Sequence, residues 1–346
     1  MRVAALGTDR GRGNLLGVEP LLAVDDYRSA EALEAVADGG LREAREAGLL
    51  GERTVAVFPE YIGAWLVAAG APERVFQAAR ATDAVRAIVS RRPGAFLWRL
   101  AVSRAADRPT ESLFRLQAVA AAQAYQQVFS RLARRYRLTV VAGSIILPGP
   151  RVDDGALRPG RGPLVDTSVV FGPDGAILPM LVRKCHPTAD ELGFVVGGAA
   201  ADLPSFRTPA GVLGVLVCAD SWFPDCWARM RGLGVEMVAV VSFSHGDGSW
   251  QLPWKGYSGA ALPPDVEPGD VGRLTEEQAW RRHALAGRIG SSGARCGINV
   301  FLRGSLWDLG SDGRTTMVRD GEVQVLRPTA IAPGSPSGGT LASLWI

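Results

Sequence analysis

VLGVLVC, residues 212–218, is an apolar run rich in β-branched residues, and it ends in a cysteine that Ala219 and Asp220 follow. A short run of this kind, without polar alternation, is typical of a strand buried on both faces of a sheet. Two comparable runs are TVAVF at 54–58 and EMVAVVSF at 236–243. Longer helical patterns separate these runs, so the sequence predicts a layered α/β fold.

The rest of the chain repeats this alternation of strands and helices. Strand-like runs occur at 2–6, 139–147 and 298–303, helical patterns at 29–49, 72–90, 110–137 and from Thr275, and hairpins at 165–184 and 305–318. The hairpins predict mixed rather than purely parallel sheets. We expect one domain over residues 1–327, followed by a Pro/Gly-rich C-terminal tail at 328–346.

Composition excludes several classes of protein. The chain has 346 residues, 47% of them hydrophobic, with 38 Lys+Arg against 35 Asp+Glu and a net charge of +3. This balance argues against disorder and against a basic surface for nucleic acid. The apolar runs have strand length rather than membrane-spanning length, and MRVAALGTDRGRG at the N-terminus turns polar too early for a signal peptide. We expect a cytoplasmic protein that binds neither nucleic acid nor membrane.

Cysteines, histidines and glycines give little sign of a disulfide framework or a nucleotide site. Four cysteines and three histidines are scattered without a CxxC pair. Gly11, Gly13 and Gly17 follow a GxGxxxG spacing, which departs from the dinucleotide fingerprint, and no GxxxxGK[ST] motif occurs. A flexible turn explains these glycines better.

Three predicted strands end in reactive side chains. Glu60 follows TVAVF, Lys184 follows AILPMLVR, and Cys218 ends VLGVLVC. Ligand sites of α/β sheets gather beside strand ends, and a base, a cation and a thiol are the parts needed for acyl transfer through a thioester. Only two of the 38 basic residues, Lys184 and Lys255, are lysine, which directs attention to both.

Each of these residues has a plausible chemical role. A thiol becomes nucleophilic on deprotonation, and Glu60 is the candidate base for Cys218. Attack on an amide or nitrile carbon creates an anion, which Lys184 and a backbone N–H beside the nucleophile could stabilise. Glu191, seven residues after Lys184, could hold the lysine or orient the leaving group.

Three sequence blocks resemble those of the nitrilase superfamily of carbon–nitrogen hydrolases. They are FPE at 58–60, RKxxPTxxE at 183–191 and GVLVCAD at 214–220, in the family's order of Glu, Lys and Cys. VVAGS at 140–144 and the GPDG turn at 172–175 also fit the family's pattern. The resemblance extends from Met1 to about Arg327.

This resemblance implies a four-layer α-β-β-α sandwich with Glu60, Lys184 and Cys218 as the catalytic triad. Glu191 falls at the position of an additional glutamate found in many members, and the Ala219 amide would help Lys184 to stabilise the tetrahedral intermediate. Ammonia or an amine leaves, and water then hydrolyses the thioester. The resemblance further implies a homodimer or larger homo-oligomer that requires no metal or organic cofactor.

The substrate class stays open at this stage. Ala219–Asp220 replaces the Trp-Glu pair that typically follows the cysteine of true nitrilases, whereas the PTxxE spacing is more similar to nitrilases than to carbamoylases. The main hypothesis is a hydrolase of a small amide or nitrile. The alternatives are an acyltransferase that uses the same thioester, and a non-catalytic binding protein on this fold.

The substrate pocket has several candidate residues, all of them near the predicted catalytic residues: Tyr61, Trp222, Phe223, Ser244 and His245. The segment Gly63–Asp107, with Trp65 and Trp98, either roofs the pocket or supplies core and interface residues. His186 could act as the base for Cys218 or Cys185, but the carboxylate at Glu60 favours a structural role for this histidine.

Overall fold

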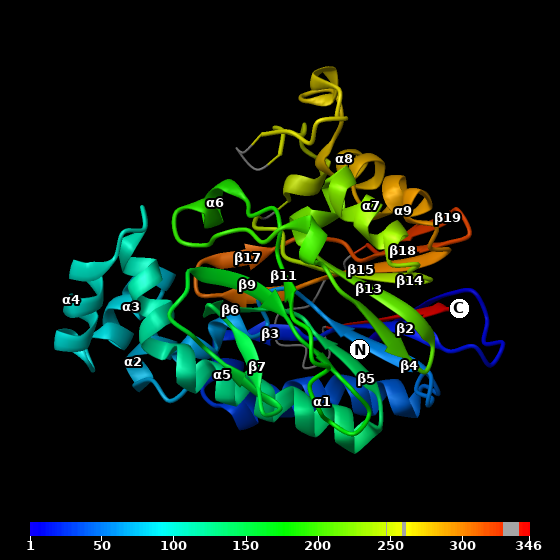
Figure 1. The fold of residues 1–346 in the computed structure, drawn as a ribbon. Coiled ribbons are helices and arrows are strands. Elements are labelled where there is room, and N and C mark those ends of the chain that lie inside the picture. The colour runs from blue at the N-terminus through cyan, green and yellow to red at the C-terminus, as the bar shows by residue number, and fades with distance from the viewer. Residues whose placement is uncertain (247, 258–260, 328–338) are drawn as a thin grey trace.

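The computed structural model describes residues 1–246, 248–257, 261–327 and 339–346. Its main elements form four layers, in which two sheets pack face to face and helices cover the outer side of each sheet (Figure 1). The predicted α-β-β-α sandwich with mixed sheets is therefore confirmed.

The first sheet has six strands in the order β1-β20-β2-β4-β5-β10. β2, β4 and β5 run parallel to one another at its centre. The strands span β1 (Arg2–Leu6), β20 (Thr340–Trp345), β2 (Asn14–Glu19), β4 (Thr54–Phe58), β5 (Thr139–Ala142) and β10 (Val170–Phe171).

The second sheet also has six strands, in the order β12-β13-β14-β15-β18-β19. Its centre is the parallel set β13, β14 and β15, and antiparallel strands flank this set. The strands span β12 (Ser205–Thr208), β13 (Gly211–Val217), β14 (Met237–Ser242), β15 (Cys296–Phe301), β18 (Thr316–Arg319) and β19 (Glu322–Val325).

Helices cover the outer faces of both sheets. α1 (Ala30–Glu46) and α5 (Arg108–Tyr136) pack against each other on the first sheet. α7 (Pro224–Gly232) and α9 (Leu285–Ser292) pack on the second sheet, with α8 (Glu276–His283) beside α9. Ser29 caps the start of α1, where its side chain accepts a hydrogen bond from the Ala32 N–H.

Shorter elements surround this sandwich. Three small sheets contain β6 (Ile145–Pro148), β9 (Leu164–Ser168) and β11 (Val182–Arg183); β3 (Leu21–Ala23), β16 (Arg303–Leu306) and β17 (Leu309–Ser311); and β7 (Arg151–Asp153) with β8 (Ala156–Arg158). The remaining α-helices are α2 (Glu73–Phe76), α3 (Ala81–Val89), α4 (Pro93–Val102) and α6 (Ala189–Leu192). The 3₁₀ turns are η1 (Val24–Tyr27), η2 (Ala64–Ala68), η3 (Ala200–Asp202), η4 (Cys218–Trp222), η5 (Ser249–Gln251) and η6 (Pro268–Asp270).

β4 shows why its sequence forms a central strand. Val55 and Val57 face the core between the two sheets, whereas Ala56 and Phe58 face the core under α1 and α5. Because side chains alternate along a strand, a strand covered on both faces must be apolar at every position. All five residues of β4 are buried.

The structure divides three segments that the sequence pattern predicts as continuous. The helical pattern 72–90 forms two helices, α2 and α3, instead of one. The run 139–147 splits into β5 and β6 at Gly143, which has a φ of +64° and lies against the Pro59 carbonyl, where a Cβ would come within 1.9 Å of the oxygen. The helix predicted from Thr275 divides at Ala284 into α8 and α9. Only glycine fits at position 143 without a clash.

The C-terminal segment differs from the predicted tail. Residues 328–338 lie outside the described residues, but β20 at Thr340–Trp345 lies inside the first sheet, antiparallel to β2 and parallel to β1. Its partners are more than 300 residues away in the sequence, so a local pattern cannot reveal the pairing.

None of the described helices is both long enough and apolar enough to cross a membrane.

Glu19, at the end of β2, should make stability depend on pH. Burial raises the pKa of its carboxyl to about 7, and its Oε1 accepts hydrogen bonds from the Phe301 N–H and the Thr315 hydroxyl. Between about pH 4.5 and pH 7 the unfolded chain releases this proton while the native chain keeps it, so stability falls as pH rises. Glu19→Gln should therefore raise the free energy of unfolding by on the order of 3 kcal/mol at pH 8.

Urea unfolding of both proteins at pH 5 and pH 8 would check this expectation. The difference between Glu19→Gln and the wild type should shrink markedly at pH 5. A difference of equal size at both pH values would contradict it.

Candidate active site

The three residues singled out at strand ends line one cavity of about 360 Å³. Glu60 follows β4 of the first sheet, Lys184 follows β11, and Cys218 begins η4 at the end of β13 in the second sheet. The site is therefore assembled where strand ends of different sheets meet. A loop after β14, beginning at Phe243, completes this side of the cavity.

Lys184 lies between two carboxylates. Its Nζ donates to Glu60 Oε1 at 2.8 Å and to Glu191 Oε2 at 2.6 Å, and all three side chains are buried. An ammonium carries three protons, so one remains for another acceptor. Burial acts to lower the pKa of Lys184, but the Glu191 and Glu60 carboxylates outweigh it and hold this pKa well above its usual value.

Glu60 has a second donor on its other oxygen. The Phe243 N–H donates to Glu60 Oε2 at 2.6 Å, which ties this glutamate to the end of β14. Burial raises the pKa of Glu60 above its ordinary value, although the Lys184 ammonium opposes this effect. A carboxyl of raised pKa is suited to exchange protons near neutral pH.

Glu191 is the most fully hydrogen-bonded carboxylate of the site. Besides Lys184, its Oε2 accepts from the Thr188 N–H at 2.7 Å and from Thr188 Oγ1 at 3.1 Å, and its Oε1 accepts from the Tyr61 hydroxyl. Burial would raise the pKa of Glu191, yet the Lys184 ammonium and these hydrogen bonds lower it below its ordinary value. Glu191 thus carries a stable negative charge that fixes Lys184.

Cys218 is held in an uncommon backbone conformation. Its φ is +46°, and Tyr61, which also lines the cavity, has a φ of +63°. The left-handed region costs a non-glycine residue on the order of 1–3 kcal/mol and is frequent at functional sites. Cys218 Sγ donates to the Phe243 carbonyl at 3.6 Å. Burial, together with the nearby Glu60 charge, raises the pKa of the thiol well above its ordinary value, so the resting thiol is protonated.

Asp220 joins the loop that carries the lysine to the turn that carries the cysteine. Its Oδ1 accepts hydrogen bonds from the backbone N–H groups of Cys185 and His186, both at 2.8 Å, and its Oδ2 accepts from Val217 N–H at 3.3 Å. Asp220 is fully buried and acts through the backbone rather than in the cavity.

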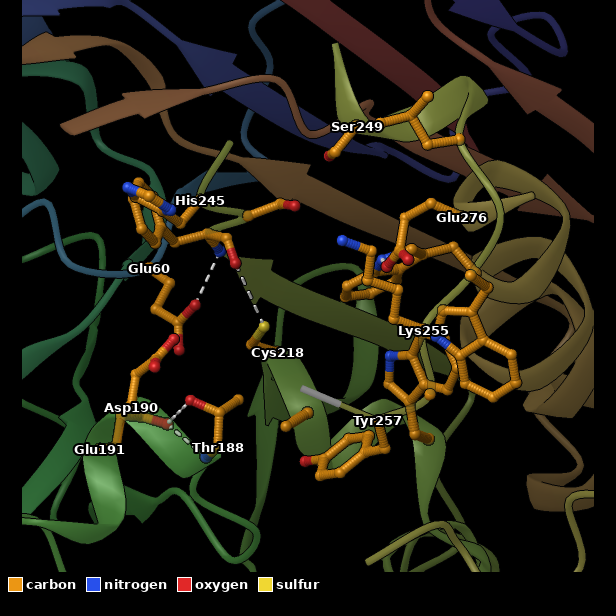
Figure 2. Close-up of a pocket in the computed structure, with 18 of the residues that line it drawn as sticks. Glu60, Thr188, Asp190, Glu191, Cys218, His245, Ser249, Lys255, Tyr257 and Glu276 are labelled. Atoms are coloured by element: carbon orange, nitrogen blue, oxygen red, sulfur yellow. Dashed lines mark hydrogen bonds between the residues drawn. The ribbon is translucent and has the colours of Figure 1, made fainter. Parts of the chain in front are cut away.

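The cavity has a charged and aromatic wall opposite the carboxylates. Figure 2 shows Glu60 and Glu191 on one side of Cys218, and Lys255 and Glu276 on the other side. Trp222, Trp254, Trp280 and Tyr257 form an aromatic group along this wall.

The structure places the predicted pocket residues as follows. Tyr61, Ala219, Trp222, Ser244 and His245 line the cavity. Phe223 is absent from the described lining; its ring stacks on His186 with centroids 3.7 Å apart and packs edge-on against Tyr257.

The structure shows where the segment Gly63–Asp107 and His186 lie relative to the cavity. Within the part of the chain that the structure describes, no residue of Gly63–Asp107 lines the cavity. Trp65 packs against Trp307, and Trp98 is 62% exposed on α4. The His186 ring bonds to Asp225 at 3.0 Å rather than to a cysteine, consistent with a structural role.

Three groups of side chains among the described residues have the ligand types of a metal site. One is Glu60, Asp166 and Glu191, where the Lys184 ammonium already bonds to two of the carboxylates. The other two share Cys226, which lies with Cys185 and Asp220 in one group and with His186 and Asp225 in the other. Backbone N–H groups already donate to the Asp220 carboxylate, and the His186 ring already bonds to Asp225.

Sequence reasoning missed several residues of the site. Asp166 lies on β9 among the carboxylates, and Tyr257 and Glu276 belong to the far wall. Lys255 had a signal, because it is one of only two lysines in the chain. The others carry no local pattern that separates them from ordinary loop or strand residues.

Comparison with known proteins relates the fold and part of the sequence to a family. Residues 97–261, which include Lys184 and Cys218, match the carbon–nitrogen hydrolase family model. A stretch of 110 residues is 29% identical to N-carbamoylputrescine amidase of Oryza sativa subsp. japonica. This match covers 28% of the chain and 36% of the rice protein, so the chain spans about a third of that relative's length.

Solved structures share the fold at low sequence identity. A carbon–nitrogen hydrolase from Helicobacter pylori G27 is 14% identical and superposes with a TM-score of 0.58, over 96% of this chain and 88% of that chain. A mutant of Nesterenkonia AN1 amidase, from the nitrilase superfamily, is 15% identical with a TM-score of 0.54, over 92% and 88%. Another mutant of that amidase, in complex with butyramide, is 16% identical with a TM-score of 0.52, over 91% and 85%.

Proposed function

We propose that the chain is a carbon–nitrogen hydrolase of the nitrilase superfamily and that it hydrolyses a small amide through a thioester on Cys218. The observation that carries the proposal is the buried contact of Lys184 with Glu60 and Glu191 in the cavity that Cys218 also lines. The amidase names of the rice and Nesterenkonia relatives favour an amide over a nitrile.

The geometry supports the following reaction. Glu60 takes the thiol proton while Cys218 Sγ attacks the amide carbon, and the carbonyl oxygen becomes an anion. Two N–H groups stabilise this anion: the third N–H of the Lys184 ammonium, which donates to neither carboxylate, and the backbone N–H of Ala219. Glu60 returns the proton to the leaving nitrogen, and ammonia or an amine departs. Glu60 then deprotonates a water that attacks the thioester, which releases a carboxylic acid and the thiol.

Ammonia release from a panel of small amides and the matching nitriles would test this function. We expect the wild type to release ammonia from at least one aliphatic amide such as butyramide, and to leave the nitriles unchanged. Faster turnover of nitriles would replace the amidase assignment with a nitrilase one. An N-acyl product formed only with an added amine acceptor, without free acid, would favour the acyltransferase.

A further inference from the structure

Asp166 is a buried carboxyl without an evident partner at this site. It lies in the middle of β9, pairs with Ile146 of β6, and is 0% exposed. Its backbone carbonyl accepts the Lys184 N–H at 2.9 Å, which places it directly beside the lysine. Neither oxygen of its carboxyl has a hydrogen-bond partner among the residues that the structure describes.

Three carboxyls therefore share one cation. Oxygens of Glu60, Asp166 and Glu191 lie within 4.8 Å of one another, and Lys184 is the ammonium that bonds to two of them. Carboxylates this close cannot all ionise beside a single cation in a buried site. One of the three should keep a proton.

Hydrogen-bond donors indicate which carboxyl keeps it. Glu60 receives donors on both oxygens, from Lys184 and the Phe243 N–H, and Glu191 receives them on both oxygens as well. Donors stabilise the ionised form of a carboxyl, and a buried carboxylate without donors is costly. Neither Asp166 oxygen has a partner within hydrogen-bond geometry in the described part of the chain, and the nearby Ser144 hydroxyl lowers its pKa less than burial and the Glu60 charge raise it. The proton therefore belongs on Asp166.

We propose that Asp166 is a positioning residue of this site and works as a neutral, protonated carboxylic acid beside Glu60 and Lys184. The inference rests on the proposed function for its effect on turnover. Burial and the neighbouring Glu60 charge also raise the pKa of Asp166 well above its ordinary value. The titratable groups that face it from the surrounding elements are Glu60, Tyr61, Tyr125, Lys184 and Glu191.

A neutral Asp166 lets the reaction develop its negative charges. With Asp166 protonated, Glu60, Glu191 and Lys184 sum to one negative charge. Ionisation would add a second negative charge, which opposes both the thiolate of Cys218 and the anionic oxygen of the intermediate. Turnover should therefore fall at alkaline pH as Asp166 loses its proton.

Asp166→Asn keeps the shape of the side chain and removes its ionisation. We expect this variant to retain kcat within about threefold of the wild type at neutral pH and to move the alkaline limb of the pH profile upward by about one pH unit or more. Asp270→Asn, which alters a buried carboxyl bonded to His283, serves as the matched control and should leave the profile unchanged. If Asp166→Asn fails to fold, Asp166→Ser replaces it.

An unchanged alkaline limb in Asp166→Asn would overturn the proposal. A loss of about 100-fold in kcat at neutral pH, with an intact fold, would also overturn it, because the negative charge of Asp166 would then be required.

Infrared difference spectra provide a measurement that needs no substrate. The wild type at pH 7 should show the C=O stretch of a protonated carboxyl that the Asp166 variant lacks. Absence of this band refutes the protonated Asp166 even if the protein is an active amidase, and its presence supports it even if no substrate is found.

Discussion

Replacing Cys218 with alanine should lower kcat/KM for the preferred amide by about 10⁴-fold or more. The substitution removes the sulfur that would form the thioester, and no other described side chain that lines the cavity is a thiol. The fold should persist, because the residue is small and already has a left-handed φ of +46°, so alanine enters no new conformation. The substitution removes a single buried sulfur atom, so the loss of packing should be modest.

Ammonia release, with a thermal melt of each protein, would measure this effect. Cys296→Ala is the matched control, because Cys296 is buried on β15 and is not among the described residues that line the cavity. We expect this control to keep wild-type turnover. Mass spectrometry of the wild type quenched during turnover should reveal an acyl adduct on the peptide that contains Cys218. Undiminished activity of Cys218→Ala would remove it as the nucleophile.

Lys184→Met should be nearly as damaging, with a loss of about 10³-fold or more in kcat/KM. Methionine approximates the length of lysine but removes the ammonium that bonds to Glu60 and Glu191. The anionic oxygen then loses a charged donor, and two buried carboxyls lose their cation. Breaking a buried ion pair from one side typically costs about 3–5 kcal/mol, so the melting temperature should fall as well.

Lys255→Met is the matched control, since it removes the only other lysine, which also lines the cavity. Lys255 is exposed and lies on the wall opposite the carboxylates, so we expect its loss to change KM more than kcat and to leave the melting temperature unchanged. Similar losses in both variants would contradict a specific role for Lys184. The double variant Glu60→Gln with Lys184→Met should be little worse than either single variant, because the groups act as a unit.

Local sequence patterns predicted a layered α/β fold with mixed sheets, and the resemblance to the nitrilase superfamily implied its four-layer arrangement. TVAVF and VLGVLVC are apolar at nearly every position, which is a requirement of strands covered on both faces, and both are central strands of the sandwich. Glu60 and Cys218 come just after these two strands, whereas Lys184 follows the two-residue strand β11. The residues at these strand ends nevertheless located the cavity. These features depend on residues close together in the sequence.

Tertiary structure decided the features that depend on distant neighbours. β20 could not be recognised because its partners lie at the other end of the chain, and Phe223 was misplaced because its neighbour His186 comes from the lysine loop. Asp166 resembles any polar residue of a hairpin until the sheets bring Glu60 and Glu191 within 4.8 Å of it. The charge and role of a buried side chain are set by the groups that surround it, and those groups come from separate strands that only folding places together.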